Sequence, residues 1–270
     1  MWTTLIEGQP PRCARMTGLR REQIDRLYAE LDLVLDWQAP LGRPKALPLY
    51  TALVMVLFQL RHNLPEDVCA ELFGCATATV WRYQEQLEPL IEVILDEFAT
   101  QARARAQIEA VLVDGFIAPV GERDDTVGLF SDKKHLPGQN VQVVSTLSGR
   151  VIDVGDPCRG ARHDSKAFVD SGLAARWAGH YAPNGPGMIG DKGYQGTGLT
   201  TPYKKPPGRD LTQARQACNT TINRIRAAVE RAIAHLKNWK ILKTGYRRSL
   251  HDFARVLRTV TSLEIYRWST

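Results

Sequence analysis

The sequence predicts an α/β protein in which an all-helical region precedes a mixed β-sheet with flanking helices. Two changes of pattern along the 270 residues support this fold class. From residue 19 to about 99, apolar residues recur every three or four positions, as at Ile24, Leu27 and Leu31, which is the spacing of a helix. Near residue 108, valine-rich segments begin. We therefore place residues 1–104 in a helical domain and residues 105–270 in an α/β domain.

Strand and helix signals alternate in the second region. Valine-rich or alternating segments predict strands at 111–113, 141–146 and 151–154, followed by a short buried strand at 187–190 and another at 200–204. Helical spacing is found at 163–173 and over a long stretch from about 211 to 239. This order of elements is typical of a mixed sheet covered by helices.

Residues 65–88 are predicted to form a helix, a short turn and a second helix. Pro65 suits the start of the first helix and Gly74 suits its end. Ala70, Gly74 and Val80 occupy the small-residue, turn-glycine and core positions of a helix-turn-helix. We therefore expect a DNA-binding module here.

The second helix of this module would offer Thr79, Arg82 and Tyr83 to a DNA major groove, whereas Trp81 is expected in the core. An ordinary helical pair used for dimerisation stays open as an alternative. It is supported by the acidic residues of the segment, which are Glu66, Asp67, Glu71, Glu85 and Glu88.

Charge is distributed unevenly. Residues 201–270 contain 15 Lys and Arg against 4 Asp and Glu, a balance of +11, and because the whole chain carries +6, the first 200 residues carry −5. The last quarter is therefore expected to hold a polyanion. No apolar stretch is long enough to cross a bilayer and no export signal is visible, so we expect a cytoplasmic, nucleoid-associated protein. Five widely spaced cysteines are expected to be reduced.

Three acids carry the chemistry that the sequence suggests. Asp114 and Asp191 each follow an apolar segment and are closely followed by glycine, which predicts carboxylates at strand ends on the rim of the sheet. Each is also compatible with a simple turn. On the long helix, Glu230 lies near the predicted sheet-facing stripe, four residues after Arg226. A surface ion pair between these two residues is the plain alternative.

These residues stand within a longer series of motifs. They are Val-Asp114-Gly, Ser131-Asp132-Lys133-Lys134-His135, Arg162-His163-Asp164-Ser165, Gly190-Asp191-Lys192-Gly193-Tyr194-Gln195-Gly196, Pro202-Tyr203-Lys204-Lys205, and Arg226 through Glu230 and Arg231 to Lys237. The series resembles the DDE superfamily endonuclease domain of insertion-sequence transposases, of the Harbinger-like group. The long helix is also similar to the signature helix of related bacterial transposases, except that Asn223 stands where those usually have tyrosine.

The resemblance implies a ribonuclease H-like fold in which Asp114, Asp191 and Glu230 bind two Mg²⁺ or Mn²⁺ ions. It also implies cleavage at transposon ends and transfer of the 3′-OH strand to target DNA. Two hard cations held by oxygen ligands suit such chemistry on a phosphodiester. Arg226 and Lys237 would contact phosphate, or Arg226 would orient Glu230. The partners implied are terminal inverted repeats and target DNA, with a homodimer in the DNA complex.

Further residues near these motifs each have two possible roles. Asp164 and His163 precede a predicted helix, where Asp is commonly an N-cap, although the resemblance also allows them to support the metal site. Lys133, Lys134 and His135 lie in a hairpin that could touch DNA or be solvated, and Arg231 is a further candidate DNA contact.

Two other functions stay open beside the transposase. One is a DNA-binding regulator with an inactive DDE nuclease domain, and the other is a related nuclease of repair or defence.

Overall fold

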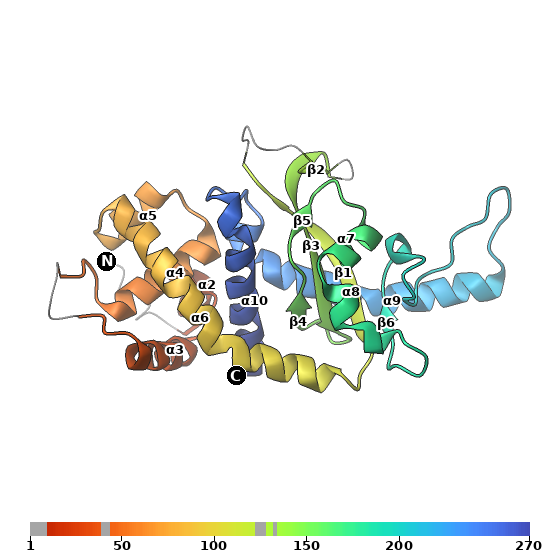
Figure 1. Cartoon of the computed structure of the whole chain (residues 1–270), viewed down its shortest axis with the longest axis horizontal. Coiled ribbons are helices and arrows are strands. Elements are labelled where there is room, and N and C mark those ends of the chain that lie inside the picture. Colours follow the sequence, from red (N-terminus) through yellow and green to blue (C-terminus); the bar gives the residue numbers. More distant parts are fainter. Residues whose placement is uncertain (1–9, 39–43, 122–127, 132–133) are drawn as a thin grey trace. The chain divides into compact units, whose positions relative to one another are not determined.

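The computed structural model describes residues 10–38, 44–121, 128–131 and 134–270 (Figure 1). The chain forms two compact units. Unit 1 comprises Met1–Phe98, Lys237–Thr244 and His251–Thr270, and unit 2 comprises Ala99–Leu236 and Gly245–Leu250.

Unit 1 is built from helices, as predicted. They are α2 (Pro10–Thr17), α3 (Arg21–Val34), α4 (Leu49–His62), α5 (Glu66–Phe73), the first part of α6 (Thr77–Ala106), the short η3 (Lys240–Leu242) and α10 (Phe253–Ser269). Every residue from 51 to 60 of α4 is buried. This helix therefore forms the centre of the unit 1 core, because a helix that is apolar on all sides must be covered on all sides.

The compact units differ from the predicted division at residues 104 and 105. Helix α10 was placed with the α/β region but belongs to unit 1. Its polar contacts explain this: the Gln23 amide donates to the Arg267 carbonyl at 3.1 Å, and Trp239 Nε1 donates to Glu264 at 3.0 Å. Helix α6 continues across the predicted boundary although Pro89 lies within it.

Unit 2 contains a mixed sheet. Its strands are β1 (Val111–Pro119), β2 (Phe130–Ser131), β3 (Leu136–Thr146), β4 (Val151–Val154), β5 (Cys158–Arg159) and β6 (Met188–Ile189). Strand β3 is antiparallel to β1, β2, β4 and β5, whereas β6 is parallel to β1. The predicted strand at 200–204 is reduced to one parallel bridge between Ile189 and Thr200. The ribonuclease H-like α/β class is confirmed, with a helical region before it.

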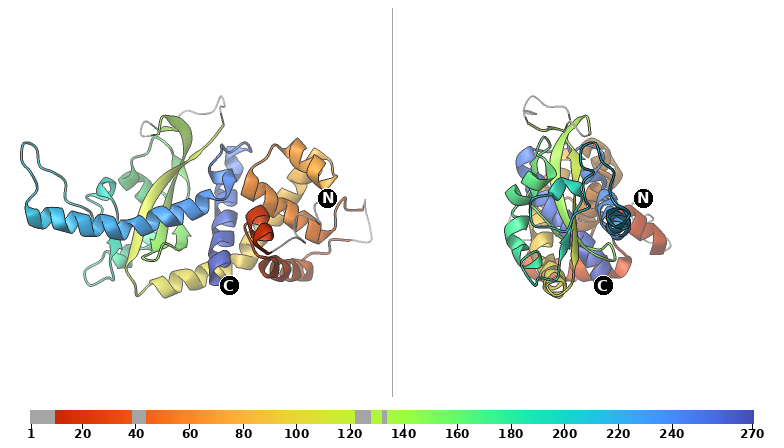
Figure 2. Two further views of the ribbon diagram at one scale, coloured as in Figure 1. Left: turned by 180° about the vertical axis from the view of Figure 1, so that it is seen from behind. Right: turned by 90° about the vertical axis from the view of Figure 1, so that its right-hand side faces the viewer.

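Helices cover both faces of the sheet (Figure 2). Helices α7 (Asp164–Asp170) and α8 (Leu173–Arg176) lie on one face and α9 (Gln213–Lys237) lies on the other. On the α9 face, Leu112 of β1 packs against Ala228 and Val229. Short 3₁₀ turns occur at η1 (Ala178–His180), η2 (Lys192–Tyr194) and η4 (Leu250–Asp252). Within the described ranges, no helix has the length and apolar character needed to cross a membrane.

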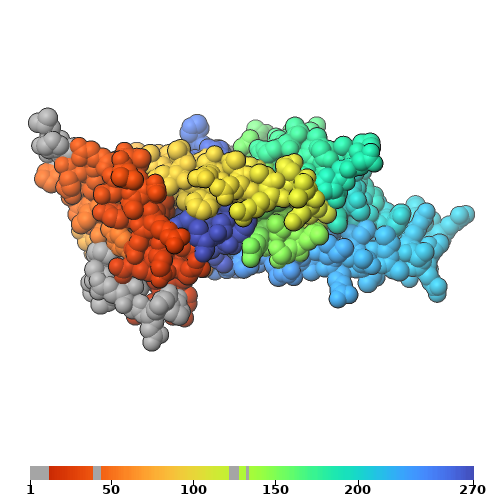
Figure 3. Space-filling view, turned by 90° about the horizontal axis from the view of Figure 1, so that it is seen from below, coloured from red at the N-terminus to blue at the C-terminus, as the bar shows by residue number. Residues whose placement is uncertain are grey.

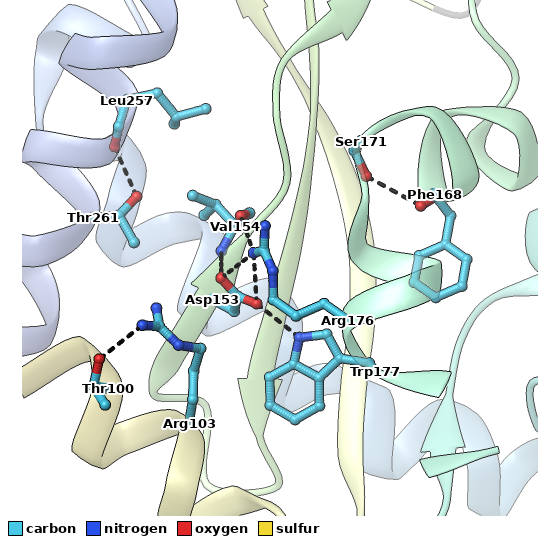
Figure 4. A network of polar contacts seen from close by, with 10 residues as sticks. All are labelled: Thr100, Arg103, Asp153, Val154, Phe168, Ser171, Arg176, Trp177, Leu257 and Thr261. Atoms are coloured by element: carbon cyan, nitrogen blue, oxygen red, sulfur yellow. Dashed lines mark hydrogen bonds and ion pairs between the residues drawn. The ribbon is translucent and has the colours of Figure 1, made fainter. Parts of the chain in front are cut away.

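A buried polar network joins β4 to α8 (Figure 4). The Asp153 carboxylate accepts from Arg176 Nη1 at 2.8 and 2.9 Å, from Trp177 Nε1 at 2.7 Å and from the Val154 amide at 2.9 Å. Asp153 is 4% exposed, so these donors replace the water it loses on folding. The network fixes α8 against the sheet.

Candidate active site

The pairing of β1 with β6 brings two predicted site residues to the same level. Val111 pairs with Met188 and Leu112 with Ile189, an offset of 77 residues. The same offset leads from Asp114 to Asp191, immediately after β6. Adjacent strands lie about 4.8 Å apart, so the two carboxylates stand beside each other. Asp114 was expected at the end of its strand; it lies inside β1, because that strand continues to Pro119.

A third acid, Asp164, lies beside this pair. Two glycines show its position: a Cβ on Gly115 would meet Asp164 Oδ1 at 3.1 Å, and a Cβ on Gly193 would meet Asp164 Oδ2 at 3.4 Å and Asp191 Oδ1 at 2.8 Å. These glycines leave space that any side chain would fill. Of the two predicted roles of Asp164, the N-cap is wrong, because His163 is the N-cap of α7 and Asp164 is its first helical residue; support of a metal site stays a prediction.

The three carboxylates influence one another electrostatically. Burial raises the pKa of Asp114, the Arg226 guanidinium and the Gly115 amide lower it, and the charges of Asp191 and Asp164 raise it, with a net upward shift. Burial also raises the pKa of Tyr194 well above its ordinary value, and the same acids add to this. The centre therefore disfavours further negative charge and favours cations.

Helix α9 presents Arg226 to this centre. Arg226 Nη2 donates to Asp114 Oδ2 at 3.0 Å, and both side chains are largely buried, at 12% and 17% exposure. Glu230, one helical turn later, is exposed to solvent and is not among the charges that shift the Asp114 pKa. The structure thus brings Asp114, Asp164 and Asp191 together and leaves Glu230 outside this group.

Two buried polar side chains, Gln142 and Asn140, connect Tyr194 to Asp164, and sequence reasoning missed them. The Tyr194 hydroxyl donates to Gln142 Oε1 at 2.5 Å, Gln142 Nε2 donates to Asn140 Oδ1 at 2.8 Å, and Asn140 Nδ2 points to Asp164 Oδ1 at 3.4 Å. Asn140 and Gln142 alternate with valines in β3. Two polar residues two positions apart in a valine-rich strand were the available signal, because they share one face.

Asp164 and Asp191 open into a cleft of about 430 Å³. Its lining also includes three residues with basic side chains, which are Lys134, Arg162 and His163. The exposed His163 ring contacts the Ser165 hydroxyl at 3.1 Å. Lys134 and His135 are both exposed, which suits a DNA contact and a solvated hairpin equally, so the DNA contact stays a prediction; Lys133 lies outside the described residues.

Comparison with known proteins identifies the family. Residues 113–263 match the model of the DDE superfamily endonucleases, and residues 45–97 match the helix-turn-helix of DDE superfamily endonucleases. The chain belongs to this family.

Two relatives support the assignment. A Streptomyces albus G protein, assigned as the transposase for insertion sequence element IS112, is 33% identical over 242 residues, which cover 88% of each chain. A Microchaete diplosiphon protein, assigned as the transposase for insertion sequence element IS702, is 31% identical over 116 residues, covering 41% of this chain and 39% of that one. No solved structure gives a significant match.

The acids of this DDE endonuclease suit the divalent metals that the family generally uses. Carboxylate oxygens are the donors that Mg²⁺ and Mn²⁺ prefer, and Gly115 and Gly193 keep side chains away from Asp164 and Asp191. Within the described part of the chain, however, no group of three or more acids, histidines or cysteines is already arranged around one point. The oxygen donors of these residues fit a divalent cation by their chemistry. The acidic side chains have to rotate before several of them can bind the same ion.

The structure corrects the prediction of which helix-turn-helix side chains are exposed. Helix α5 ends at Gly74, as predicted, in the left-handed conformation with φ 68°. Thr79 is 6% and Tyr83 1% exposed, so neither is available to a major groove; the Tyr83 hydroxyl accepts from the Ala46 amide at 3.0 Å. Trp81, expected in the core, is 52% exposed. The exposed face at the start of α6 was thus wrongly predicted by a fraction of a turn; Trp81 and Arg82 are exposed there, together with Thr77 and Ala78.

The unit 2 part of α9 and the loop before it carry exposed cations (light blue in Figure 3). These residues are Lys204, Lys205, Arg209, Arg215, Arg224 and Arg231. Arg224 and Arg231 line a hollow of about 500 Å³ together with Thr220 and Thr221. Lys237, the last residue of α9, is half-buried. The positive charge predicted for the last quarter is therefore concentrated partly on an open surface of unit 2.

Proposed function

We propose that the chain is the transposase of an insertion sequence, which cleaves at the element's ends and joins the freed 3′-OH strand to target DNA. The observation that carries this proposal is the placement of Asp114 beside Asp191, which lines a cleft, in a chain with the endonuclease and helix-turn-helix domains of one family. The transposase assignments of its relatives agree with it.

The chemistry is a pair of substitutions at phosphorus. Water breaks the P–O3′ bond at the element end and leaves a 3′-hydroxyl, which then attacks a target phosphodiester as one P–O bond forms and another breaks. Two Mg²⁺ or Mn²⁺ ions would activate the attacking oxygen and stabilise the leaving one. Asp114 and Asp191 would hold them, while Lys134 and Arg162 of the cleft hold the phosphate.

Glu230 is the third metal ligand of this proposal. Because its side chain is exposed one turn after Arg226 on α9, it has to turn toward Asp114 when metal and DNA bind. Arg226 would then leave Asp114 and contact either the phosphate or Glu230.

DNA binding in the proposal uses both units. The helix-turn-helix binds terminal inverted repeats through the exposed side of α6, and the cations of α9, including Arg231, hold phosphates of terminal or target DNA. Joining two ends requires two sites, so we propose a homodimer in the DNA complex. With DNA as its substrate, the protein would work on the nucleoid in the cytoplasm.

The exposure of Glu230 and the ion pair on Asp114 favour one alternative. In it, the chain is a DNA-binding regulator whose nuclease domain has lost its activity.

A cleavage assay separates these functions. The full chain is incubated with Mg²⁺ and DNA bearing the element's inverted repeats. Asp114→Ala and Asp191→Ala should each lower strand cleavage by more than about 100-fold, because even partners of metal ligands are worth about 10–100-fold. DNA binding should be retained. Asp156→Ala, which removes an exposed acid of the same unit, serves as the control. Wild-type protein that binds DNA without cutting it would instead support the regulator.

DNA binding by α6 has its own test. Arg82→Ala should weaken binding to inverted-repeat DNA in a gel-shift titration and reduce its salt dependence, because a phosphate or base contact is lost. Thr79→Ala is the matched control on the buried side of the same helix. Equal loss of binding in both variants at equal stability would show that the exposed face of α6 does not read DNA.

A further inference from the structure

A carboxylate outside the predicted set of three acids is held at the cleft by a directed series of hydrogen bonds. Asp164 is the first residue of α7, and His163 occupies the N-cap position, so the Asp164 carboxylate is not the N-cap of this helix. An acid in the first turn also interacts favourably with the helix dipole. That effect alone does not explain its surroundings.

The surroundings of Asp164 consist of polar side chains that each donate a hydrogen bond to the next, in the direction of Asp164. Tyr194 is fully buried, so its hydroxyl must find an acceptor, and it finds Gln142 Oε1. This contact turns the Gln142 amide nitrogen toward Asn140, whose own amide nitrogen then points to Asp164. The Asn140 amide nitrogen donates to the Arg162 carbonyl at 3.0 Å and faces Asp164 Oδ1 at 3.4 Å, so the series ends with a donor beside the Asp164 carboxylate.

The position of Asp164 connects it to Asp191. Both carboxylates border Gly193, and both line the cleft of about 430 Å³. The Asp191 Oδ1 atom accepts from the Gly193 amide at 2.6 Å, which fixes one oxygen. The opposite side of Asp164 borders Gly115, the residue after Asp114.

We propose that Asp164 is itself a metal ligand of this endonuclease and supplies an oxygen to the ion held by Asp191, with Tyr194, Gln142 and Asn140 as its positioning residues. The inference deepens the proposed function and rests on the metal chemistry of that function. The metal centre then has four carboxylates. Asp164 binds the ion together with Asp191, and Glu230 of α9 becomes a ligand afterwards, when DNA binds.

The test is Mn²⁺ binding by the full chain without DNA, measured as loss of the free-ion electron paramagnetic resonance signal. Asp164→Asn and Asp191→Asn should each weaken binding by at least about 10-fold. Glu230→Gln and the control Asp156→Asn should change it much less, because neither side chain borders the cleft. Circular dichroism checks the fold; if Asp164→Asn does not fold, Asp164→Ser, which keeps a residue that helix starts accept, is measured for the same loss.

The outcomes separate this inference from the proposed function. Mn²⁺ affinity that depends on Asp164 in a protein that cuts no DNA would uphold the inference while the transposase proposal fails. Wild-type affinity in folded Asp164→Asn or Asp164→Ser protein, or a wild-type chain that binds no Mn²⁺, would overturn the inference. Gln142→Leu, which interrupts the donor series, should weaken Mn²⁺ binding less than Asp164→Asn does.

Discussion

Unit 2 buries carboxylates in two places, and the two differ in how their charge is compensated. Asp153 accepts hydrogen bonds from two side chains and one amide within a packed network (Figure 4). The second group consists of Asp114, Asp164 and Asp191, of which Asp164 and Asp191 line the cleft; these two raise the pKa of Asp114. Burial of an acid therefore does not indicate a functional site by itself. Mutual repulsion between acids beside an open cleft is the stronger indication, because an added cation would stabilise such a group.

Asp153→Ala should have the largest effect on stability. Removing the carboxylate leaves the buried Trp177 Nε1 without its acceptor and Arg176 without its partner. We expect a loss of about 2–4 kcal/mol in the free energy of unfolding, measured by urea denaturation. Asp156→Ala, an exposed neighbour, should change it little. If Asp153→Ala loses as little free energy of unfolding as that control, the Asp153 network does not stabilise the fold, and the contrast with the group of three acids does not hold.

Metal addition should stabilise the cleft acids and leave the Asp153 network unaffected. At a free Mn²⁺ concentration of ten times Kd, binding adds about 1.4 kcal/mol to the free energy of unfolding. Thermal unfolding of the wild-type chain should therefore shift upward with Mn²⁺ and return with EDTA. Asp191→Asn should lose this response, whereas destabilised Asp153→Ala should keep it. An equal shift in wild-type and Asp191→Asn protein would place the ion elsewhere.

The pH dependence of stability should show the smallest effect, from one carboxyl group. Because the pKa of Asp114 is raised in the folded state, its contribution to stability is fully present below the ordinary aspartate pKa and is lost as pH rises through the raised value. Asp114→Asn lacks this loss. The free energy of unfolding of Asp114→Asn minus that of wild type should thus be larger at neutral pH than below about pH 4. The opposite trend in urea titrations would mean that Arg226 dominates over burial.

Regular patterns were the reliable part of the sequence. The helical spacing of Ile24, Leu27 and Leu31 correctly predicted buried positions of α3, and Gly74 correctly marked the turn of the helix-turn-helix. Thr79 and Tyr83 were assigned to the wrong side of α6, because a helical period fixes the width of a face but not which neighbour covers it. The tight contacts of α6 within unit 1 decided that.

The active centre was predictable where strands position it. Apolar runs before Asp114 and Asp191 were sufficient to associate each acid with a strand, and parallel pairing of β1 with β6 then set them at one level. The sequence left open whether Asp164 is a cap or supports the metal site, because its relation to Gly115 and Gly193 spans 49 and 29 residues of chain. No local pattern contains such a relation.

By itself, the sequence determined the order of the longer helices and strands, the acids available for metal chemistry and the basic character of the last quarter, but not the short strands β2 and β5. These follow from local periodicity and composition, which act over a few residues. Only the tertiary structure decided that Asp164 joins Asp114 and Asp191, that Arg226 contacts Asp114, and that α10 packs with unit 1. Such contacts depend on strand register and on the rotation of each helix about its axis, both of which are fixed only when side chains far apart in the chain pack against one another.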